Sequence, residues 1–164
     1  MKEIVLSQGK VALIDDGDFK RVNQFKWSVG KQNRGWCAVR KVQRDNKSVK
    51  FFMHRFILDA PKGLDVDHIN GNTLDNRRVN IRICTRRQNQ QNQLSVHGLS
   101  KYKGVYWHHE RWVTRITVNK VRIHLGCFFL EEEAARAYDK AALECFTEYA
   151  QTNRMLGLLG ELNK

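Results

Sequence analysis

The sequence lacks the markers of several large protein classes. Its 164 residues include one proline, Pro61, and four cysteines that stand far apart in the chain. No two cysteines form a Cys-x-x-Cys pair, which argues against a structural zinc ribbon. Each cysteine stands in an apolar or strand-like context, so we expect buried free thiols in a reducing compartment. The four are Cys37, Cys84, Cys127 and Cys145.

Long apolar runs and acidic residues are scarce as well. No run approaches the roughly 20 apolar residues that a membrane-spanning helix needs, and Met1-Lys2-Glu3 leads into a short strand rather than a signal peptide. We therefore expect a soluble, cytoplasmic protein with no membrane partner. Against 17 acidic residues stand 29 Lys and Arg, a net charge of +12. Such a charge attracts polyanions, and nucleic acid is the favoured one.

Residues 67–89 concentrate polar side chains that suit a catalytic site rather than a core. Asp67 and His68 are adjacent, Asn70-Gly71-Asn72 supplies a turn, and further Asn and Arg residues follow at intervals. Oxygen ligands hold a hard cation, a histidine can take a proton near neutral pH, and arginine grips phosphate. This combination indicates a site where a metal ion and an activated water meet a phosphodiester.

The pattern around this cluster predicts a strand, a loop, a strand and a helix. Alternation marks short strands over 64–68 and 80–83. Thr85 can cap a helix that begins near Arg86 and presents Asn89 and Asn92 on one face. Such a unit lets a histidine at the end of the first strand face a ligand on the helix.

Residues 52–93 resemble an HNH nuclease of the ββα-metal class, in the variant of phage and intron homing endonucleases. The resemblance implies that Asp67 is a metal ligand and that His68 is the general base. Asn80 would brace the loop and orient His68. Asn89, in place of the family's last histidine, would be the second metal ligand. This His-Asn-Asn variant has one formal anionic ligand, which favours Mg²⁺ or Mn²⁺ over zinc.

The same residues also have ordinary interpretations. Asp67-His68 alone favours a turn or a structural pair, and arginines taken singly favour a solvated face. The combination with Asn80 and Asn89 favours a nuclease. Among the clustered arginines, we expect Arg82 and Arg86 to neutralise charge that develops on the phosphate.

Residues 1–60 read mainly as strands broken by glycines and charged turns. Phe52 to Leu58 predicts a helix with Phe52 and Phe56 inward and Met53 as a further candidate for the inward face, and His54 on it is interpreted as a satisfied core histidine. Because the nuclease segment is too small to be stable alone, we expect the first 60 residues to pack against it.

The chain changes character after a polar linker, residues 94–100. Three strands over 104–107, 111–118 and 121–129 are joined by short turns at His109-Glu110 and Asn119-Lys120. A helix follows that begins with three glutamates at 131–133 and continues with alanines at helical spacing. One face of the sheet is covered by this helix, and the other is free to enter a major groove.

The C-terminal residues resemble an APETALA2-type DNA-binding domain, most clearly in Lys103-Gly104-Val105 and in the helix 131–142. In that family the sheet enters the major groove. The Trp-Gly of plant members is replaced by His108-His109-Glu110, so the target sequence cannot be transferred. The residues that would face DNA are Lys103, Tyr106, His108, Arg111, Arg115, Thr117, Arg122 and His124.

The expected fold is α+β, with a β-rich N-terminal segment packed on a ββα-metal nuclease unit and then a three-stranded antiparallel sheet with one helix. The predicted domains are 1–93, with a nuclease core at 52–93, the linker 94–100, the APETALA2-type domain 101–153 and a tail 154–164. The predicted function is a Mg²⁺-dependent homing-type endonuclease that cuts double-stranded DNA. We favour a monomer in a bacterial cytoplasm, encoded by the bacterium or a phage. The alternatives are a DNA-binding regulatory protein with an inactive nuclease unit and, with less support, an RNA-binding protein.

Overall fold

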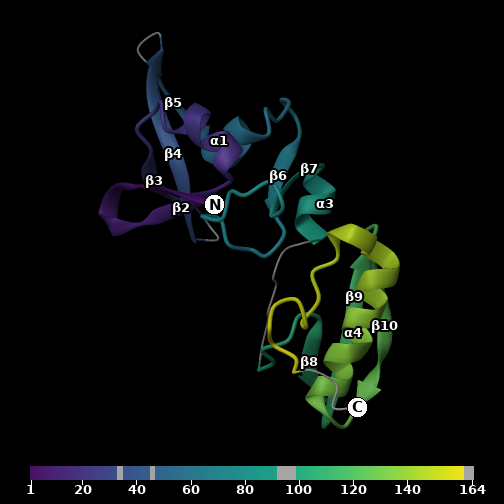
Figure 1. Ribbon diagram of the computed structural model, residues 1–164. Helices are drawn as coiled ribbons and strands as arrows, with labels where there is room; N and C mark the ends of the chain where they lie inside the picture. Colours follow the sequence, from purple (N-terminus) through teal and green to yellow (C-terminus); the bar gives the residue numbers. More distant parts are fainter. Residues whose placement is uncertain (33–34, 45–46, 92–98, 161–164) are drawn as a thin grey trace. The chain divides into compact units, whose positions relative to one another are not determined.

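The computed structural model describes residues 1–32, 35–44, 47–91 and 99–160, and its chain divides into two compact units, 1–89 and 90–164 (Figure 1). Both units combine small antiparallel sheets with a few helices, so the predicted α+β class is confirmed. The linker predicted at 94–100 falls mostly on residues 92–98, which lie outside the described residues, as does Asn92.

The first unit contains three small sheets, β1-β2, β3-β4-β5 and β6-β7. Its strands are β1 (Lys2–Val5), β2 (Val11–Ile14), β3 (Ser28–Gln32), β4 (Gly35–Arg44), β5 (Lys47–Phe52), β6 (Asp65–His68) and β7 (Ile81–Cys84). Its helices are the short 3-10 turn η1 (Ser7–Gly9), α1 (Asp16–Val22), α2 (Met53–Ile57) and α3 (Arg86–Gln91), whose last residues pass into the second unit.

A single apolar core joins the N-terminal strands to the β6-β7 hairpin. Ile81 of β7 packs in the same buried cluster as Ile14 of β2, Trp27, and Met53 and Ile57 of α2. Burial of this apolar surface is the main favourable term in folding, and the hairpin alone could not supply it. Residues 1–60 and the β6-β7 hairpin therefore share one set of buried apolar residues.

The helix expected over 52–58 is shorter than predicted, and Ile57 joins the candidate Met53 on its buried face. It spans Met53–Ile57, and its fully buried residues are Met53 and Ile57, whereas Phe52 and Phe56 are half-buried. In the same unit Thr85 caps α3 as predicted: the Gln88 amide donates to Thr85 Oγ1, and the Thr85 amide donates to Gln88 Oε1. This reciprocal pair is a capping box.

The second unit is a three-stranded sheet with one long helix along one face (Figure 1). Its elements are β8 (Val105–His108), β9 (Arg111–Val118), β10 (Val121–Phe128), α4 (Glu131–Phe146) and the 3-10 turn η2 (Thr147–Tyr149). His109, Glu110, Asn119 and Lys120 all have positive φ, as two-residue hairpin turns of the I′ type require. Both predicted turns are confirmed.

Small residues let α4 lie close to the sheet. Ala134, Ala135 and Ala142 are fully buried. At Gly104, with φ of +78°, a Cβ atom would come within 2.0 Å of the Tyr138 ring, so only glycine fits there. Leu159 is buried in the same core, which corrects the prediction of a tail from residue 154: the domain continues to at least that residue.

Two of the four cysteines differ from expectation. Cys37 and Cys84 are buried free thiols, and burial raises the pKa of Cys84 to about 11. Cys127 and Cys145 are exposed, because they fall on the outward positions of β10 and α4.

Candidate functional site

The β6-β7 hairpin separates the two central residues of the motif. Asp67 pairs in register with Arg82, and His68 pairs with Ile81. Because successive side chains of a strand point to opposite faces, Asp67 and His68 lie on different sides of the hairpin. Each therefore has its own set of partners.

On the first side, the carboxylate of Asp67 forms an ion pair with Arg82. Asp67 is 2% exposed, and its Oδ2 accepts from Arg82 Nη2 at 2.8 Å and from Nε at 3.0 Å. A buried charge needs such a partner. A cation that binds Oδ2 of this carboxylate would compete with the guanidinium of Arg82.

Asn89 contacts a different carboxylate, that of Asp65, two residues before Asp67 on the same face of β6. Its Nδ2 donates to Asp65 Oδ2 at 3.0 Å. Since the amide nitrogen is committed to Asp65, the amide oxygen of Asn89 is turned to the other side and remains an acceptor. Asp65 thus orients Asn89, a role that the sequence interpretation missed.

The donor chemistry on this side fits a hard divalent cation. Asp65, Asp67 and Asn89 offer carboxylate and amide oxygens, the ligands that Mg²⁺ prefers. Among the residues that the structure describes, no group of three His, Cys, Asp or Glu is placed to hold a metal ion. These residues therefore suit a cation that takes part of its oxygen ligands from the protein and the rest from water and phosphate.

On the second side, His68 is buried and bonded to Asn76. His68 Nε2 lies 3.3 Å from Asn76 Oδ1, while Asn76 Nδ2 donates to the carbonyl of Leu74. With Oδ1 as acceptor, Nε2 carries the proton, and Nδ1 holds the lone pair of the neutral ring. Burial lowers the pKa of His68, against smaller opposing effects of Asn76, Asp67 and Asp75. A neutral imidazole of this kind can act as a base.

His54 is the second histidine of this site, and the interpretation of it as a satisfied core residue is wrong. Its ring meets the His68 ring edge-on, with the centroids 5.1 Å apart, and stacks on Phe52. Its Nδ1 is buried without a hydrogen-bond partner among the described residues. Burial, helped by the positive charge of Arg55, lowers the pKa of His54 to about 3.

The loop between β6 and β7 is braced by Asn80. Its Nδ2 donates to the Asp75 carbonyl at 2.8 Å, and its Oδ1 accepts from the Asn70 amide at 3.0 Å. The loop is also tied to β2, because the Leu13 amide donates to the Leu74 carbonyl and the Asn76 amide donates to the Leu13 carbonyl. Asn76, the partner of His68, is thereby held by the N-terminal strands.

The arginines of the motif divide into two groups. Arg77, Arg78 and Arg82 form ion pairs with the buried Asp75, Asp18 and Asp67. The hydrogen bond from Arg77 is the largest cause of the lowered pKa of Asp75. Arg86 and Arg87 are exposed at the start of α3. Of the two arginines predicted to meet phosphate, Arg82 is engaged with Asp67 and Arg86 faces solvent.

The open face of the C-terminal sheet carries most of the predicted DNA-facing residues. His124 pairs in register with Arg115 and Arg122 with Thr117, so all four point to the side away from the apolar cluster under α4. The Arg115 guanidinium lies 4.6 Å from the centre of the Tyr106 ring, and that of Arg111 lies 3.4 Å from the Phe129 ring. His108, Arg115, Thr117, Arg122 and His124 are exposed, and Tyr106 and Arg111 are half-buried.

Lys103 does not belong to that face. It is 6% exposed, and its Nζ donates to the carbonyls of Gln91 and Gln151. Its backbone amide donates to Asn153, which also bonds to Asp139. A buried ammonium needs hydrogen-bond partners within the protein, and Lys103 finds them in the carbonyls of Gln91 and Gln151. The prediction that Lys103 faces DNA is therefore corrected.

Residues 59–91 match the model of the HNH endonuclease family. This range contains the β6-β7 hairpin, α3 and every residue predicted for catalysis or metal binding. The uncharacterized HNH endonuclease of Acanthamoeba polyphaga mimivirus is 28% identical over 155 residues, 90% of this chain and 77% of the viral protein. We call residues 59–91 the HNH region.

Plant proteins match a smaller part of the chain. An ethylene-responsive transcription factor-like protein of Arabidopsis thaliana is 50% identical over 46 residues, 28% of this chain and 20% of the plant protein. An AP2-like ethylene-responsive transcription factor of the same plant is 45% identical over 60 residues, 34% of this chain and 17% of its own length. The chain thus spans a fifth or less of these plant relatives. In the described part of the chain, every helix is too short or too polar to cross a membrane.

Proposed function

We propose that the protein is a metal-dependent DNA endonuclease of the homing type, which hydrolyses phosphodiester bonds in double-stranded DNA. The observation that carries the proposal is the HNH region itself, residues 59–91, whose hairpin holds the buried His68, with its lowered pKa, next in sequence to Asp67 at the end of β6. The net charge of +12 supports a polyanionic substrate.

In the proposed mechanism, His68 accepts the proton of the attacking water. Asn76 holds its ring from one side, and Asn80 braces the loop that carries Asn76. Asp67 and Asn89 would hold Mg²⁺ or Mn²⁺, which when bound supplies positive charge at the scissile phosphate.

Arg82 and Arg86 are the residues proposed to neutralise charge on the phosphate. Arg82 is paired with Asp67 in the free protein, so a phosphate would have to draw its guanidinium away from that carboxylate. Such an exchange would free Asp67 for the cation in the same movement. Arg86 is exposed and needs no such release.

The C-terminal sheet is proposed to find the site. Its open face combines Arg115, Arg122 and His124 with aromatic rings, and a sheet can enter the major groove of B-form DNA. The AP2-like relatives favour this role, since their names describe transcription factors.

We further propose that the protein acts as a monomer in the cytoplasm of a bacterium, encoded by the cell or by a phage. One HNH region per chain gives one active site, so a monomer would cut one strand at a time.

Incubation with supercoiled plasmid tests the activity. We expect nicked circles in Mg²⁺, none in EDTA, and none with the His68→Ala protein in Mg²⁺. Selection of preferred sites from random DNA, followed by strand-resolved mapping of the cuts, then tests the homing-type specificity. Absence of Mg²⁺-dependent nicking by a folded protein that binds DNA contradicts the proposal.

A second candidate is a sequence-specific DNA-binding regulatory protein with an inactive HNH region. The ion pair between Asp67 and Arg82 favours this second candidate, because Oδ2 of the carboxylate is already bonded to the guanidinium in the free protein. The plasmid assay separates the two candidates, since the regulatory protein would bind its selected sites in Mg²⁺ without nicking them.

A further inference from the structure

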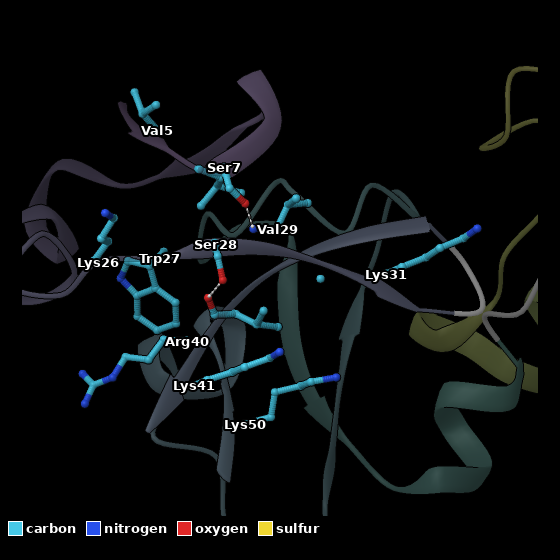
Figure 2. A pocket seen from close by; sticks show the side chains of 13 residues that line it. Val5, Ser7, Lys26, Trp27, Ser28, Val29, Lys31, Arg40, Lys41 and Lys50 are labelled. Atoms are coloured by element: carbon cyan, nitrogen blue, oxygen red, sulfur yellow. Dashed lines mark hydrogen bonds between the residues drawn. The ribbon is translucent and has the colours of Figure 1, made fainter. Parts of the chain in front are cut away.

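A basic hollow lies on the N-terminal unit, and its lining residues in the described part of the chain all come from outside the HNH region. Its volume is about 920 Å³, and it is lined by the segment after β1 and by strands β3, β4 and β5 (Figure 2). Within the described part of the chain, its lining holds no Asp or Glu. Five of its 13 lining residues are cationic: Lys26, Lys31, Arg40, Lys41 and Lys50.

Two of these lysines repel each other in the free protein. Lys41 on β4 and Lys50 on β5 are direct cross-strand partners, and their side chains extend side by side in Figure 2. Both are exposed. Like charges directly opposite each other destabilise a sheet, and an anion bound between the two ammonium groups would remove this repulsion.

The floor of the hollow offers little to a small polar ligand. Ser7 Oγ already accepts from the Val29 amide, and Ser28 Oγ donates to the Val39 carbonyl. Gly30 contributes no side chain, and a Cβ there would lie 2.9 Å from the Val39 side chain. Recognition therefore rests on the cations around the floor.

Arg40 differs from the lysines because its guanidinium is held in place. It lies 3.8 Å from the centre of the Phe25 ring and 5.8 Å from that of Phe51. A stacked guanidinium keeps its edge donors available to phosphate and loses little freedom on binding. The Arg40 side chain points away from Lys41 and Lys50, because neighbouring residues of β4 face opposite sides of the sheet (Figure 2). The four flexible lysines, spread around the floor, therefore provide the contacts, and they suit a chain of phosphates better than a single anion.

We propose that the basic hollow binds the sugar-phosphate backbone of duplex DNA, as a contact separate from the catalytic hairpin and from the C-terminal sheet. The proposal rests on the proposed function only in taking DNA as the polyanion. Phosphate contacts position a protein on DNA and carry no sequence information directly, so this contact strengthens binding to all sequences alike.

The test compares two double variants of the full-length protein that lose the same charge. Lys41→Gln with Lys50→Gln removes two cations of the hollow, and Lys20→Gln with Lys62→Gln removes two exposed cations outside it. Binding to a labelled duplex is measured by fluorescence anisotropy in EDTA over a series of salt concentrations. Thermal unfolding checks that each variant is folded, and the hollow variant should be no less stable than the wild type.

We expect the hollow variant to bind about fivefold more weakly at moderate salt, and the slope of log K against log salt to fall by about 1.8, or 0.9 for each lost phosphate contact. The control variant should change much less, and the order of preferred sequences should be the same in all three proteins. Equal losses in the two variants would overturn the proposal. So would a hollow variant that keeps its affinity for DNA and loses affinity only for duplex RNA or for phosphatidylserine vesicles.

The two proposals fail in different ways. If the wild-type protein does not nick plasmid but the hollow variant shows the expected loss of DNA affinity, the nuclease proposal fails and the backbone contact stands. If plasmid is nicked and the hollow variant binds as the control does, the reverse holds.

Discussion

In the unit of residues 1–89, Arg77, Arg78 and Arg82 pair with buried carboxylates. In the unit of residues 90–164, Arg111 and Arg115 of the sheet instead lie beside aromatic rings. Arg78 makes two bonds of 2.8 Å to Asp18 and a third to the Ile57 carbonyl. Arg115, by contrast, is exposed and rests on Tyr106. The same residue type thus stabilises one unit and is available to a ligand in the other.

This comparison shows why a basic cluster in a sequence is weak evidence for phosphate binding. Asp18, Asp67 and Asp75 are each buried, and a buried carboxylate without a partner is costly. Arg77, Arg78 and Arg82 provide those partners. Other cations of the first unit are exposed, among them Arg86 and Arg87 at the start of α3 and Lys41 and Lys50 of the basic hollow.

The largest expected effect separates chemistry from binding. His68→Ala should lower the rate of plasmid nicking by about 10²- to 10⁴-fold, the usual contribution of a general base, with little change in DNA affinity. His124→Ala, the matched histidine of the open sheet face, should weaken binding and leave the rate at saturating protein nearly unchanged. Single-turnover cleavage and anisotropy measure both. Loss of DNA binding by a folded His68→Ala protein would make His68 a contact residue.

Removal of the negative charge of Asp67 should have the next largest effect on nicking. Asp67→Asn should reduce Mg²⁺-dependent nicking severely, since it removes the formal negative charge proposed for the cation, and it should also destabilise the first unit because Arg82 loses its partner. Measurement of nicking over a Mg²⁺ titration in zinc-free buffer checks the first effect. Tightly bound stoichiometric zinc that proves necessary for activity would refute the Mg²⁺ assignment.

A pair of arginine variants sharpens the contrast between the units. Arg78→Ala should lower the free energy of unfolding by about 2 kcal/mol, because it leaves Asp18 buried and unpaired while Arg78 itself is half-exposed. Arg115→Ala should leave stability unchanged and shift sequence preference by roughly 1–3 kcal/mol at one base pair, if it contacts guanine. Urea unfolding and site selection distinguish them. A uniform loss of affinity across sequences in Arg115→Ala would indicate a phosphate contact instead.

The last expected effect concerns pH and the first unit alone. Because the pKa of His54 is about 3 in the folded protein and about 6.5 when unfolded, the unfolded chain binds the extra proton between these values. Stability should be full above pH 6.5 and fall as pH drops toward 3, by at most about 1.4 kcal/mol per pH unit for this group. His54→Gln should flatten the slope. Hydrogen exchange by mass spectrometry reports each unit separately, and an equal slope in the variant would contradict the assignment.

The sequence by itself determined the features that depend on neighbouring residues. The hairpin turns at His109-Glu110 and Asn119-Lys120, the cap of α3 by Thr85 and the alanine-rich helix were predictable, because turns, caps and periodicity are set within a few positions. The Asp67-His68 motif and its fixed spacing also marked the HNH region without a structure.

Tertiary structure decided which partner each polar side chain takes. Arg78 and Asp18 are 60 positions apart, and Lys103 and Asn153 are 50 apart. His54 comes to lie against His68 only because α2 packs into the core that also holds β7. Local pattern sets which face of an element is buried, but the identity of the group across the interface depends on how distant segments pack, and that carries no local signal.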